Sequence, residues 1–217
     1  MGTSTIELDK RMRAIFVHVP TSITQFCGVF PSDRLPPDFL QSSLCSASSY
    51  VPFSVACIAN TDPSNLPGQH WVAFYIDRSR SPPIFEFFDS YGLTPSDYNF
   101  PTISPNAHLI HNPIALQSLT STVCGQYCIL YLYLRTLFAM SAPKISNQPL
   151  IQISDKILNL APSPTQRDRI VRQIVNHLPQ PSIHFTPHLS LSLPTFTGTS
   201  ILPSVSANQS CRPFNMH

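Results

Sequence analysis

Charged side chains are scarce in this chain of 217 residues: Lys, Arg, Asp and Glu make up 11% of it, and the formal net charge is +2. A chain with so little excess positive charge is not expected to have nucleic acid as its main partner. No apolar run approaches the roughly 18 residues that a membrane-spanning helix needs, and the first residues lack the charged-then-apolar pattern of a secretion signal. We therefore expect a protein that neither spans a membrane nor is secreted.

Paired metal-ligand spacings are also missing. The cysteines stand at positions 27, 45, 57, 124, 128 and 211, and without a secretion signal we expect them to be reduced thiols rather than a disulfide framework. Cys124 and Cys128 lie one helical turn apart, but no second pair completes a metal site. His108 and His111 likewise lack further ligands. We expect no metal ion.

The most informative stretch runs from Gln117 to Met140. Between Ile129 and Met140 only Arg135 is charged, which predicts a helix that is buried on most sides. Small and hydroxyl-bearing residues come just before it, so the helix is expected to begin at Cys124. There, the unpaired backbone N–H groups and the helix dipole favour a thiolate. Cys124 is therefore a candidate nucleophile; a buried structural cysteine is the alternative.

Two predicted strands precede this helix. Residues 70–77 are bulky on both faces, which indicates a central strand, and residues 84–90 form a second strand. The short connection over residues 78–83 favours an antiparallel hairpin. In a hairpin the start of the first strand and the end of the second lie at the same edge, so we expect His70 to lie beside Asp89.

The other segments complete an α+β domain. We expect helices at residues 5–17, 151–160 and 164–178, and strands at residues 52–60 and near residues 107–110. Residues 26–37 are predicted to be a rigid extended loop with glycine and proline. From Pro179 onward the only Lys, Arg, Asp or Glu is Arg212. We therefore predict one domain over residues 1–178 and a low-charge, Ser/Pro-rich, unstructured tail over residues 179–217.

A cysteine protease needs a thiolate, an imidazole, a group that orients the imidazole, and donors for the oxyanion. Cys124, His70 and Asp89 would supply the first three if the helix packs beside the hairpin edge. Each residue alone has an ordinary explanation: a structural cysteine, a surface histidine and a turn aspartate. Gln117, seven residues before Cys124, is by itself a polar loop residue.

Jointly, these residues resemble the adenovirus-type endopeptidase family, adenain, and more narrowly the adenain-like proteases of Maverick/Polinton elements and adintoviruses. The resemblance is carried by His70-Trp71, FDSYG at 88–92, Gln117 and TVCG at 122–125, with further similarity at 57–62 and 68–74. It covers residues 5–178. The order histidine, aspartate, glutamine, cysteine also matches the wider superfamily that includes proteases of ubiquitin-like modifiers, whereas papain-type enzymes begin with the cysteine.

The resemblance implies a role for each matched residue. Cys124 would be the nucleophile, His70 the general base and then the general acid, and Asp89 the partner that orients the imidazole. The Gln117 side-chain amide and the Cys124 backbone N–H would donate hydrogen bonds to the oxyanion. Trp71 would roof a narrow cleft that admits glycine-rich substrate; a core tryptophan is its other interpretation.

Two features depart from adenain. Adenain has a glutamate where this chain has Asp89, and Glu86 is a weaker candidate because strand alternation puts it on the opposite face. In adenain, a cysteine between the catalytic acid and the glutamine binds an activating viral peptide, but residues 90–123 contain no cysteine. Activation by a peptide or by DNA is therefore weakly supported, and we expect no cofactor.

The resemblance implies an α+β fold, a single domain of the adenain/ubiquitin-like-protease type whose small, mainly antiparallel sheet packs on a central helix carrying the nucleophile. It implies a thiol endopeptidase that cleaves viral or transposable-element structural precursors, such as capsid or core proteins, at glycine-containing sites. Such an enzyme would work in the virion or in the nucleus or cytoplasm of a host cell. A protease of ubiquitin-like modifiers and a non-catalytic binding module are the alternatives.

Overall fold

A five-stranded sheet lies at the centre of the computed structural model, which describes residues 4–36, 54–98, 100, 107–141 and 148–180. Its strands, in the order in which they lie side by side, are β1 (Thr24–Phe30), β2 (Ser54–Asn60), β3 (Trp71–Asp77), β4 (Ile84–Phe88) and β5 (His108–His111). Apart from its first two residues, the tail predicted for 179–217 lies outside the described residues, as do Cys45 and Cys211.

The sheet is antiparallel at its centre and parallel at both edges. β3 pairs antiparallel with β2 and with β4, so the predicted hairpin is confirmed, with Ala73 opposite Phe88. The edge strands differ from a purely antiparallel sheet, because β1 runs parallel to β2 and β5 runs parallel to β4. In each parallel pair a long connection joins the two strands. A local sequence pattern does not show whether such a connection leads to a parallel or an antiparallel neighbour.

The prediction of a loop over residues 26–37 is wrong in its first part. Thr24–Phe30 is strand β1, and the one-turn 3₁₀ helix η1 (Ser32–Arg34) follows it. A β-bulge between Phe26 and Gly28 interrupts the pairing with β2, and Gly28 has a φ of 137°, which favours glycine. The glycine that indicated a loop is therefore the bulge residue of a strand, and only the pairing with β2 makes that visible.

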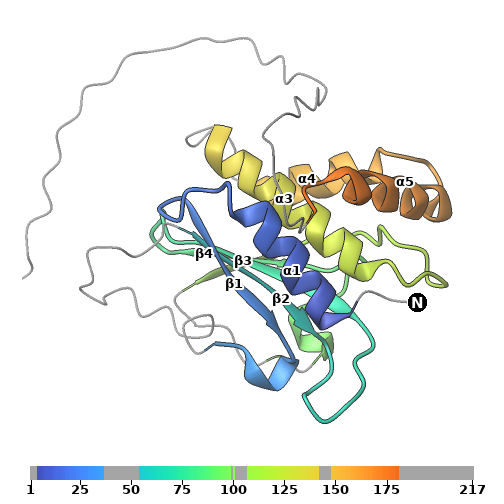
Figure 1. The fold of residues 1–217 in the computed structure, drawn as a ribbon, viewed down its shortest axis with the longest axis horizontal. Coiled ribbons are helices and arrows are strands. Elements are labelled where there is room, and N and C mark those ends of the chain that lie inside the picture. Colours follow the sequence, from blue (N-terminus) through green and yellow to red (C-terminus); the bar gives the residue numbers. More distant parts are fainter. Residues whose placement is uncertain (1–3, 37–53, 99, 101–106, 142–147, 181–217) are drawn as a thin grey trace, which may run out of the picture. The chain divides into compact units, whose positions relative to one another are not determined.

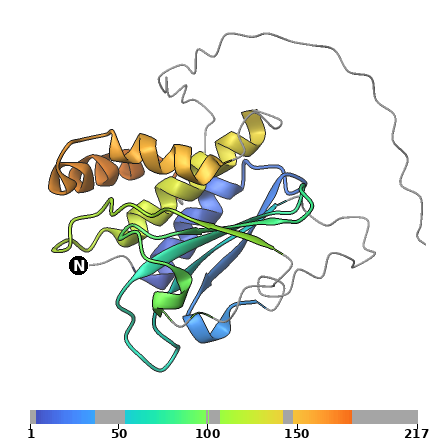
Figure 2. The same ribbon diagram turned by 180° about the vertical axis from the view of Figure 1, so that it is seen from behind.

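The helices lie on one side of the sheet in Figures 1 and 2. They are α1 (Thr5–Phe16), α3 (Cys124–Ser141), α4 (Pro149–Leu158) and α5 (Pro164–His177), and all four fall where the sequence predicts helices. α1 and α3 pack against the sheet and against each other, while α4 and α5 pack against α3. Ser163 caps α5 by accepting a hydrogen bond from the Gln166 N–H. The α+β prediction is confirmed.

Helix α3 is the centre of the core on this side of the sheet. Its residues 127–129, 131 and 132 are completely buried, together with residues of α1, α4, α5 and the strands. A second apolar cluster, rich in phenylalanine, covers the other face of β2, β3 and β4. The central strands β2, β3 and β4 are therefore buried on both faces. Within the described residues, no helix is long and apolar enough to cross a membrane.

Candidate active site

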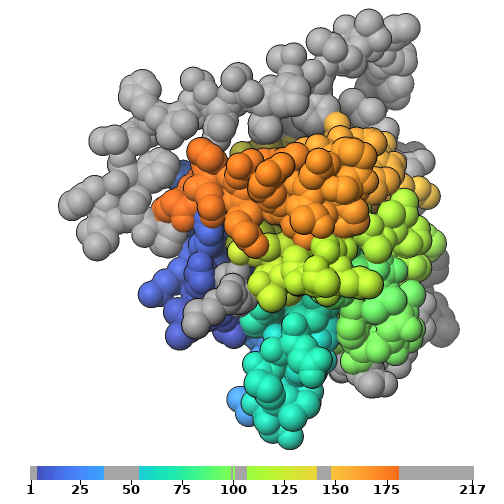
Figure 3. All heavy atoms as spheres, turned by 90° about the vertical axis from the view of Figure 1, so that its right-hand side faces the viewer, coloured from blue at the N-terminus to red at the C-terminus, as the bar shows by residue number. Residues whose placement is uncertain are grey.

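Three chain segments meet at the end of the sheet where β3 begins and β4 finishes. They are residues 61–70, which lead into β3, residues 89–98, which follow β4, and residues 112–123, which lead into α3. In Figure 3 they adjoin one another as teal, green and yellow-green atoms. His70 directly precedes β3, Asp89 directly follows β4, and Cys124 is the first residue of α3. The structure therefore brings the predicted site residues to one place.

His70 and Asp89 form a buried pair. The imidazole Nε2 lies 2.6 Å from Asp89 Oδ1, and the two residues are 6% and 0% exposed. The same carboxylate accepts hydrogen bonds from three further donors: the Tyr91 N–H at 3.0 Å, the Leu93 N–H at 2.9 Å and the Tyr98 hydroxyl at 2.9 Å. These donors fix the orientation of the carboxylate, which in turn fixes the plane of the imidazole.

The Cys124 thiol lies close enough to the same imidazole to contribute to the pKa of His70. Because Nε2 is occupied by Asp89, Nδ1 is the ring nitrogen that remains for the thiol. Burial by itself disfavours the charged imidazolium, but the hydrogen bond to Asp89, followed by that to Cys124, outweighs burial and raises the pKa of His70 from 6.5 to about 9. An imidazole that stays protonated at neutral pH beside a cysteine is the arrangement that stabilises a thiolate.

The turn that holds Asp89 is fixed by its neighbours. Asn112 accepts a hydrogen bond from the Asp89 N–H at 2.9 Å and donates one to its carbonyl at 2.6 Å. The turn closes with a hydrogen bond from the Gly92 N–H to the Asp89 carbonyl at 3.0 Å. Gly92 has a φ of 75°, and a Cβ there would lie 2.7 Å from the carbonyl carbon of Ile114. Only glycine therefore allows this turn to lie against the segment that carries Gln117.

Gln117 is 2% exposed, and Ser90 orients its side chain. The Ser90 hydroxyl donates a hydrogen bond to Gln117 Oε1 at 2.7 Å, while its carbonyl accepts from the Gln117 N–H at 3.0 Å. The amide nitrogen Nε2 donates to the Ser121 carbonyl at 2.9 Å and lies 3.3 Å from the Tyr91 hydroxyl. One amide hydrogen of Gln117 is thus engaged by the Ser121 carbonyl, and the other makes only a longer contact with the Tyr91 hydroxyl. This second hydrogen can be donated to a substrate oxygen.

Two further candidates, Trp71 and Glu86, contact the helix-side core and helix α3. Trp71 is half-buried at the start of β3 and packs against the helix-side core, and its role over the cleft stays a prediction. Glu86 is completely buried and accepts hydrogen bonds from the Tyr131 hydroxyl at 2.5 Å and from Arg135 Nε at 2.9 Å. Its carboxylate is therefore engaged by α3, as expected from its position on the other face of the strand from Asp89.

Sequence reasoning missed the residues that support the site. The Tyr91 ring stacks on the His70 ring, with centroids 4.6 Å apart and an angle of 26° between the planes. Burial, then the nearby charges of Cys124 and Asp89, raises the pKa of Tyr91. Tyr91 belongs to the FDSYG motif, but nothing in the motif shows which way the ring turns. Asn112 carries no local signal, because its two bonds to Asp89 exist only once β5 pairs with β4.

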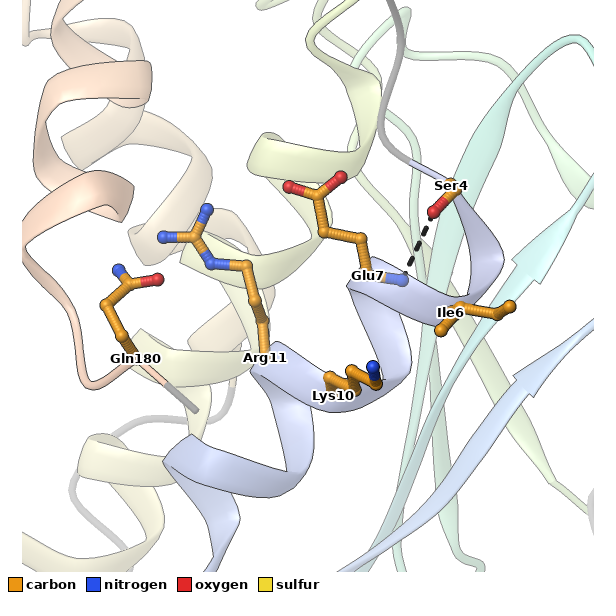
Figure 4. A pocket seen from close by; sticks show the side chains of 6 residues that line it. All are labelled: Ser4, Ile6, Glu7, Lys10, Arg11 and Gln180. Carbon is orange, nitrogen blue, oxygen red and sulfur yellow. Dashed lines mark hydrogen bonds between the residues drawn. The ribbon is translucent and has the colours of Figure 1, made fainter. Parts of the chain in front are cut away.

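A surface hollow of about 340 Å³ lies away from this site, between the N-terminal turn of α1 and the segment after α5. Figure 4 shows Arg11 and Gln180 on its two sides. Its lining comprises Ser4, Ile6, Glu7, Lys10, Arg11 and Gln180, and includes none of the predicted site residues. Among the described residues, no group of three or more His, Cys, Asp or Glu side chains could hold a metal ion.

No protein-family model and no curated protein matches the chain. Several solved structures resemble its fold, among them the following three. The ASFV pS273R protease is 17% identical over 70% of this chain and 66% of its own, with a TM-score of 0.43. A de-sumoylating protease is 13% identical over 82% of this chain and 81% of its own (TM-score 0.46), and the central domain of the Lpg1148 protein from Legionella pneumophila is 16% identical over 82% and 99% (TM-score 0.45). Because these sequence identities and TM-scores are low, a functional assignment has to rest on the geometry of the site.

Proposed function

We propose that the protein is a cysteine endopeptidase in which Cys124 is the nucleophile, His70 the general base and acid, and Asp89 the partner that orients the imidazole. The observation that carries the proposal is the single buried imidazole that bonds Asp89 through Nε2 at 2.6 Å and whose pKa is also raised by the nearby Cys124. A nucleophile, a base and an orienting carboxylate in a hydrogen-bonded row are the parts that covalent acyl transfer needs.

The chemistry proceeds in two steps. The Cys124 thiolate attacks the carbonyl carbon of the substrate peptide, and the tetrahedral intermediate collapses to a thioester as the His70 imidazolium gives its proton to the departing amine. His70 then takes a proton from a water molecule, whose oxygen attacks the thioester and releases the carboxylic acid and the thiol. The hydrogen bond with Asp89 keeps the imidazole directed at the sulfur and, later, at the water.

The oxyanion of each intermediate would receive two hydrogen bonds. One comes from Gln117 Nε2, whose second hydrogen makes only a long contact, 3.3 Å, with the Tyr91 hydroxyl. The other comes from the backbone N–H of Cys124, which, as the first residue of α3, has no partner one turn earlier within the helix. The positive end of the α3 helix dipole would further stabilise the negative charge of the oxyanion.

The substrate class rests on the motifs of the sequence. The resemblance of His70-Trp71, residues 88–92 and residues 122–125 to adenain-like proteases supports structural precursor proteins of a virus or transposable element, cleaved at glycine-containing sites. Trp71 would then roof the cleft beside Cys124. The same resemblance leaves an activating peptide as a candidate partner, although its usual attachment cysteine is missing from residues 90–123.

The first test is cleavage of peptides that carry glycine near the scissile bond, with Cys124→Ala as the inactive control. A diglycine-tailed ubiquitin-like modifier is assayed in parallel. If the protein preferentially cleaves the tail of the modifier, its substrates are ubiquitin-like modifiers and not structural precursors. No turnover of either, with the protein folded, would make it a binding module.

The second test is mass-spectrometric mapping after brief iodoacetamide treatment at neutral pH. Cys124 should label first, because its thiolate is stabilised by His70 and the helix N-terminus. Cys57 and Cys128 should be slow, since burial raises the pKa of both thiols. Labelling of Cys128 before Cys124 would contradict the assignment of the nucleophile.

A further inference from the structure

We infer that Arg167 and Asp168, on α5, are positioning residues that hold Gln117 in place for catalysis. The inference rests on the proposed function, in which Gln117 donates to the oxyanion. The two side chains come from a helix that begins 47 residues after Gln117, at Pro164. Neither belongs to the motifs that indicate a protease, and neither touches His70, Asp89 or Cys124 in the hydrogen bonds described above.

Arg167 binds backbone carbonyls rather than solvent. It is 2% exposed, and Nη1 donates to the Leu116 carbonyl at 2.5 Å. Nη2 donates to the Ala161 carbonyl at 3.0 Å, and Nε donates to the Leu158 carbonyl at 3.2 Å. The guanidinium thus joins the residue before Gln117 to the end of α4 and to the connection between α4 and α5.

Asp168 holds the residue on the other side of Gln117. It is 5% exposed, and its carboxylate oxygens lie 3.3 and 3.4 Å from the Ser118 N–H. Its Oδ1 also accepts a hydrogen bond from the Tyr127 hydroxyl at 2.9 Å, and that hydroxyl lies 3.1 Å from the Leu116 carbonyl. Tyr127 is on α3, less than one turn after Cys124. The carboxylate therefore connects the Gln117 segment to the helix that carries the nucleophile.

Both charges are buried at a cost. Arginine and aspartate are seldom fully buried, because removing a charge from water is unfavourable unless strong hydrogen bonds replace the water. Packing alone would be served by apolar side chains at these positions. What the two charged groups provide instead is a set of directed bonds, which join residues 116 and 118 to the end of α4, to the α4–α5 connection and to Tyr127 of α3.

The segment needs such support. Leu116 and Val123 are buried, but Leu119, between them, is 85% exposed, so apolar burial fixes the two ends of this stretch and not its middle. Ser90 holds Gln117 from the sheet side, through its hydroxyl and its carbonyl. Arg167 and Asp168 hold the flanking residues from the helix side. An oxyanion donor is effective only when it is held rigidly at the right point, so both supports bear on the rate.

Steady-state kinetics on a peptide that the wild-type protein cleaves test the inference. Asp168→Asn keeps the shape but weakens the bond to the Ser118 N–H, and Arg167→Lys cannot bind three carbonyls at once. Each should lower kcat about 10- to 100-fold with KM little changed, because a slightly misplaced group loses that much. Asp155→Asn and Arg169→Lys, at exposed positions on α4 and α5, are the matched controls and should keep the wild-type kcat.

The decisive measurement is a double-variant cycle with Gln117→Ala, which by itself should lower kcat about 100- to 1,000-fold. If Asp168 acts through Gln117, adding Asp168→Asn to Gln117→Ala should lower kcat no further, since a donor that is absent cannot be misplaced. Multiplying losses would overturn the inference. The alkylation rate of Cys124 should be unchanged in every variant, because alkylation uses no oxyanion donor; a general loosening of the site would change it.

Two outcomes separate this inference from the proposed function. If the wild-type protein cleaves peptides but Asp168→Asn and Arg167→Lys keep full kcat, the positioning role alone is wrong. If the wild-type protein cleaves nothing, the proposed function is wrong and the catalytic role of α5 falls with it. Amide hydrogen exchange at Ser118, compared between Asp168→Asn and Asp155→Asn, then decides whether α5 holds the segment: equal exchange would show that it does not.

Discussion

Two completely buried carboxylates, Glu86 and Asp89, lie three residues apart in the sequence but serve different networks. Glu86 is paired with Arg135, whose guanidinium also lies over the Tyr75 ring at 4.0 Å. Burial disfavours the charge on Arg135, but Glu86 outweighs burial and raises the pKa of Arg135. Asp89 is paired with His70, whose pKa is raised to about 9.

The comparison shows what distinguishes a structural buried charge from a chemical one. An arginine does not release its proton at any pH that the protein experiences, so the Glu86 pair can only hold α3 against the sheet. An imidazole can lose and regain its proton near neutral pH, and this one also bonds a thiol. The two carboxylates are equally buried but have different consequences, because Glu86 pairs with an arginine and Asp89 pairs with a histidine beside Cys124.

Removing the charge of Asp89 should have the largest effect on catalysis and should separate the two carboxylates most clearly. Asp89→Asn should leave the fold intact and lower kcat by about 10,000-fold, the loss seen when the orienting carboxylate of a hydrolytic triad becomes an amide. Glu86→Gln should leave kcat near the wild-type value. Kinetics on both variants, with circular dichroism to confirm folding, provide the check. Equal losses with unchanged thermal stability would mean that the third member is misassigned.

The same pair of substitutions should rank in the opposite order for stability. Glu86→Gln leaves the buried Arg135 with Asp77, 3.4 Å from Nη2, as its remaining counter-charge, and should lower the free energy of unfolding by up to the roughly 3–5 kcal/mol that breaking a buried ion pair costs. Asp89→Asn should cost less, because His70 can become neutral when its partner does. Urea denaturation of both variants at pH 7 measures the difference. A Glu86→Gln protein as stable as the wild type would show that the Arg135 charge finds another partner.

The raised pKa of His70 makes stability fall with pH over a defined range. Between about pH 6.5 and 9 the folded protein holds a proton on His70 that the unfolded chain has lost, so the titration of His70, taken alone, favours unfolding at higher pH. This contribution is complete below pH 6.5 and is lost as the pH rises through 9; it amounts to about 3 kcal/mol at most.

Urea denaturation as a function of pH measures this contribution. In Asp89→Asn the decline should weaken and move to lower pH, because burial then acts without the carboxylate. The alkaline limb of kcat/KM should move the same way. An identical pH profile in the two proteins would show that Asp89 does not control the His70 proton.

The smallest effect is expected from Tyr98, whose hydroxyl donates to Asp89 Oδ2 at 2.9 Å. Tyr98→Phe removes one of four donors to the carboxylate and leaves the His70, Tyr91 and Leu93 bonds in place. The loss of a single hydrogen bond is worth about 1 kcal/mol, so kcat should fall no more than about tenfold. Steady-state kinetics will show this, and a loss as large as that of Asp89→Asn would mean that the hydroxyl takes part in the reaction.

Much of the fold could be predicted from the sequence because its signals are local. The apolar run after Cys124, the capping residues before α5 and the short connection between β3 and β4 each specify an element within a few residues. The hairpin then brings His70 and Asp89 to one edge by geometry alone. The structure places Cys124 at the start of α3, as the sequence predicts, and close enough to His70 to contribute to the pKa of its imidazole.

Only the tertiary structure decided the features that depend on distant parts of the chain. Strand β1 contains Gly28 at a bulge and is recognisable only by its pairing with β2. The bonds from Ser90 and α5 to the Gln117 segment, and from Asn112 to Asp89, join residues between 23 and 51 positions apart. A local pattern carries no record of such contacts, because a buried polar side chain chooses its partner only when the chain has folded around it. The sequence by itself therefore determined which residues could do chemistry and at which strand and helix ends they stand, while packing determined how rigidly each one is held.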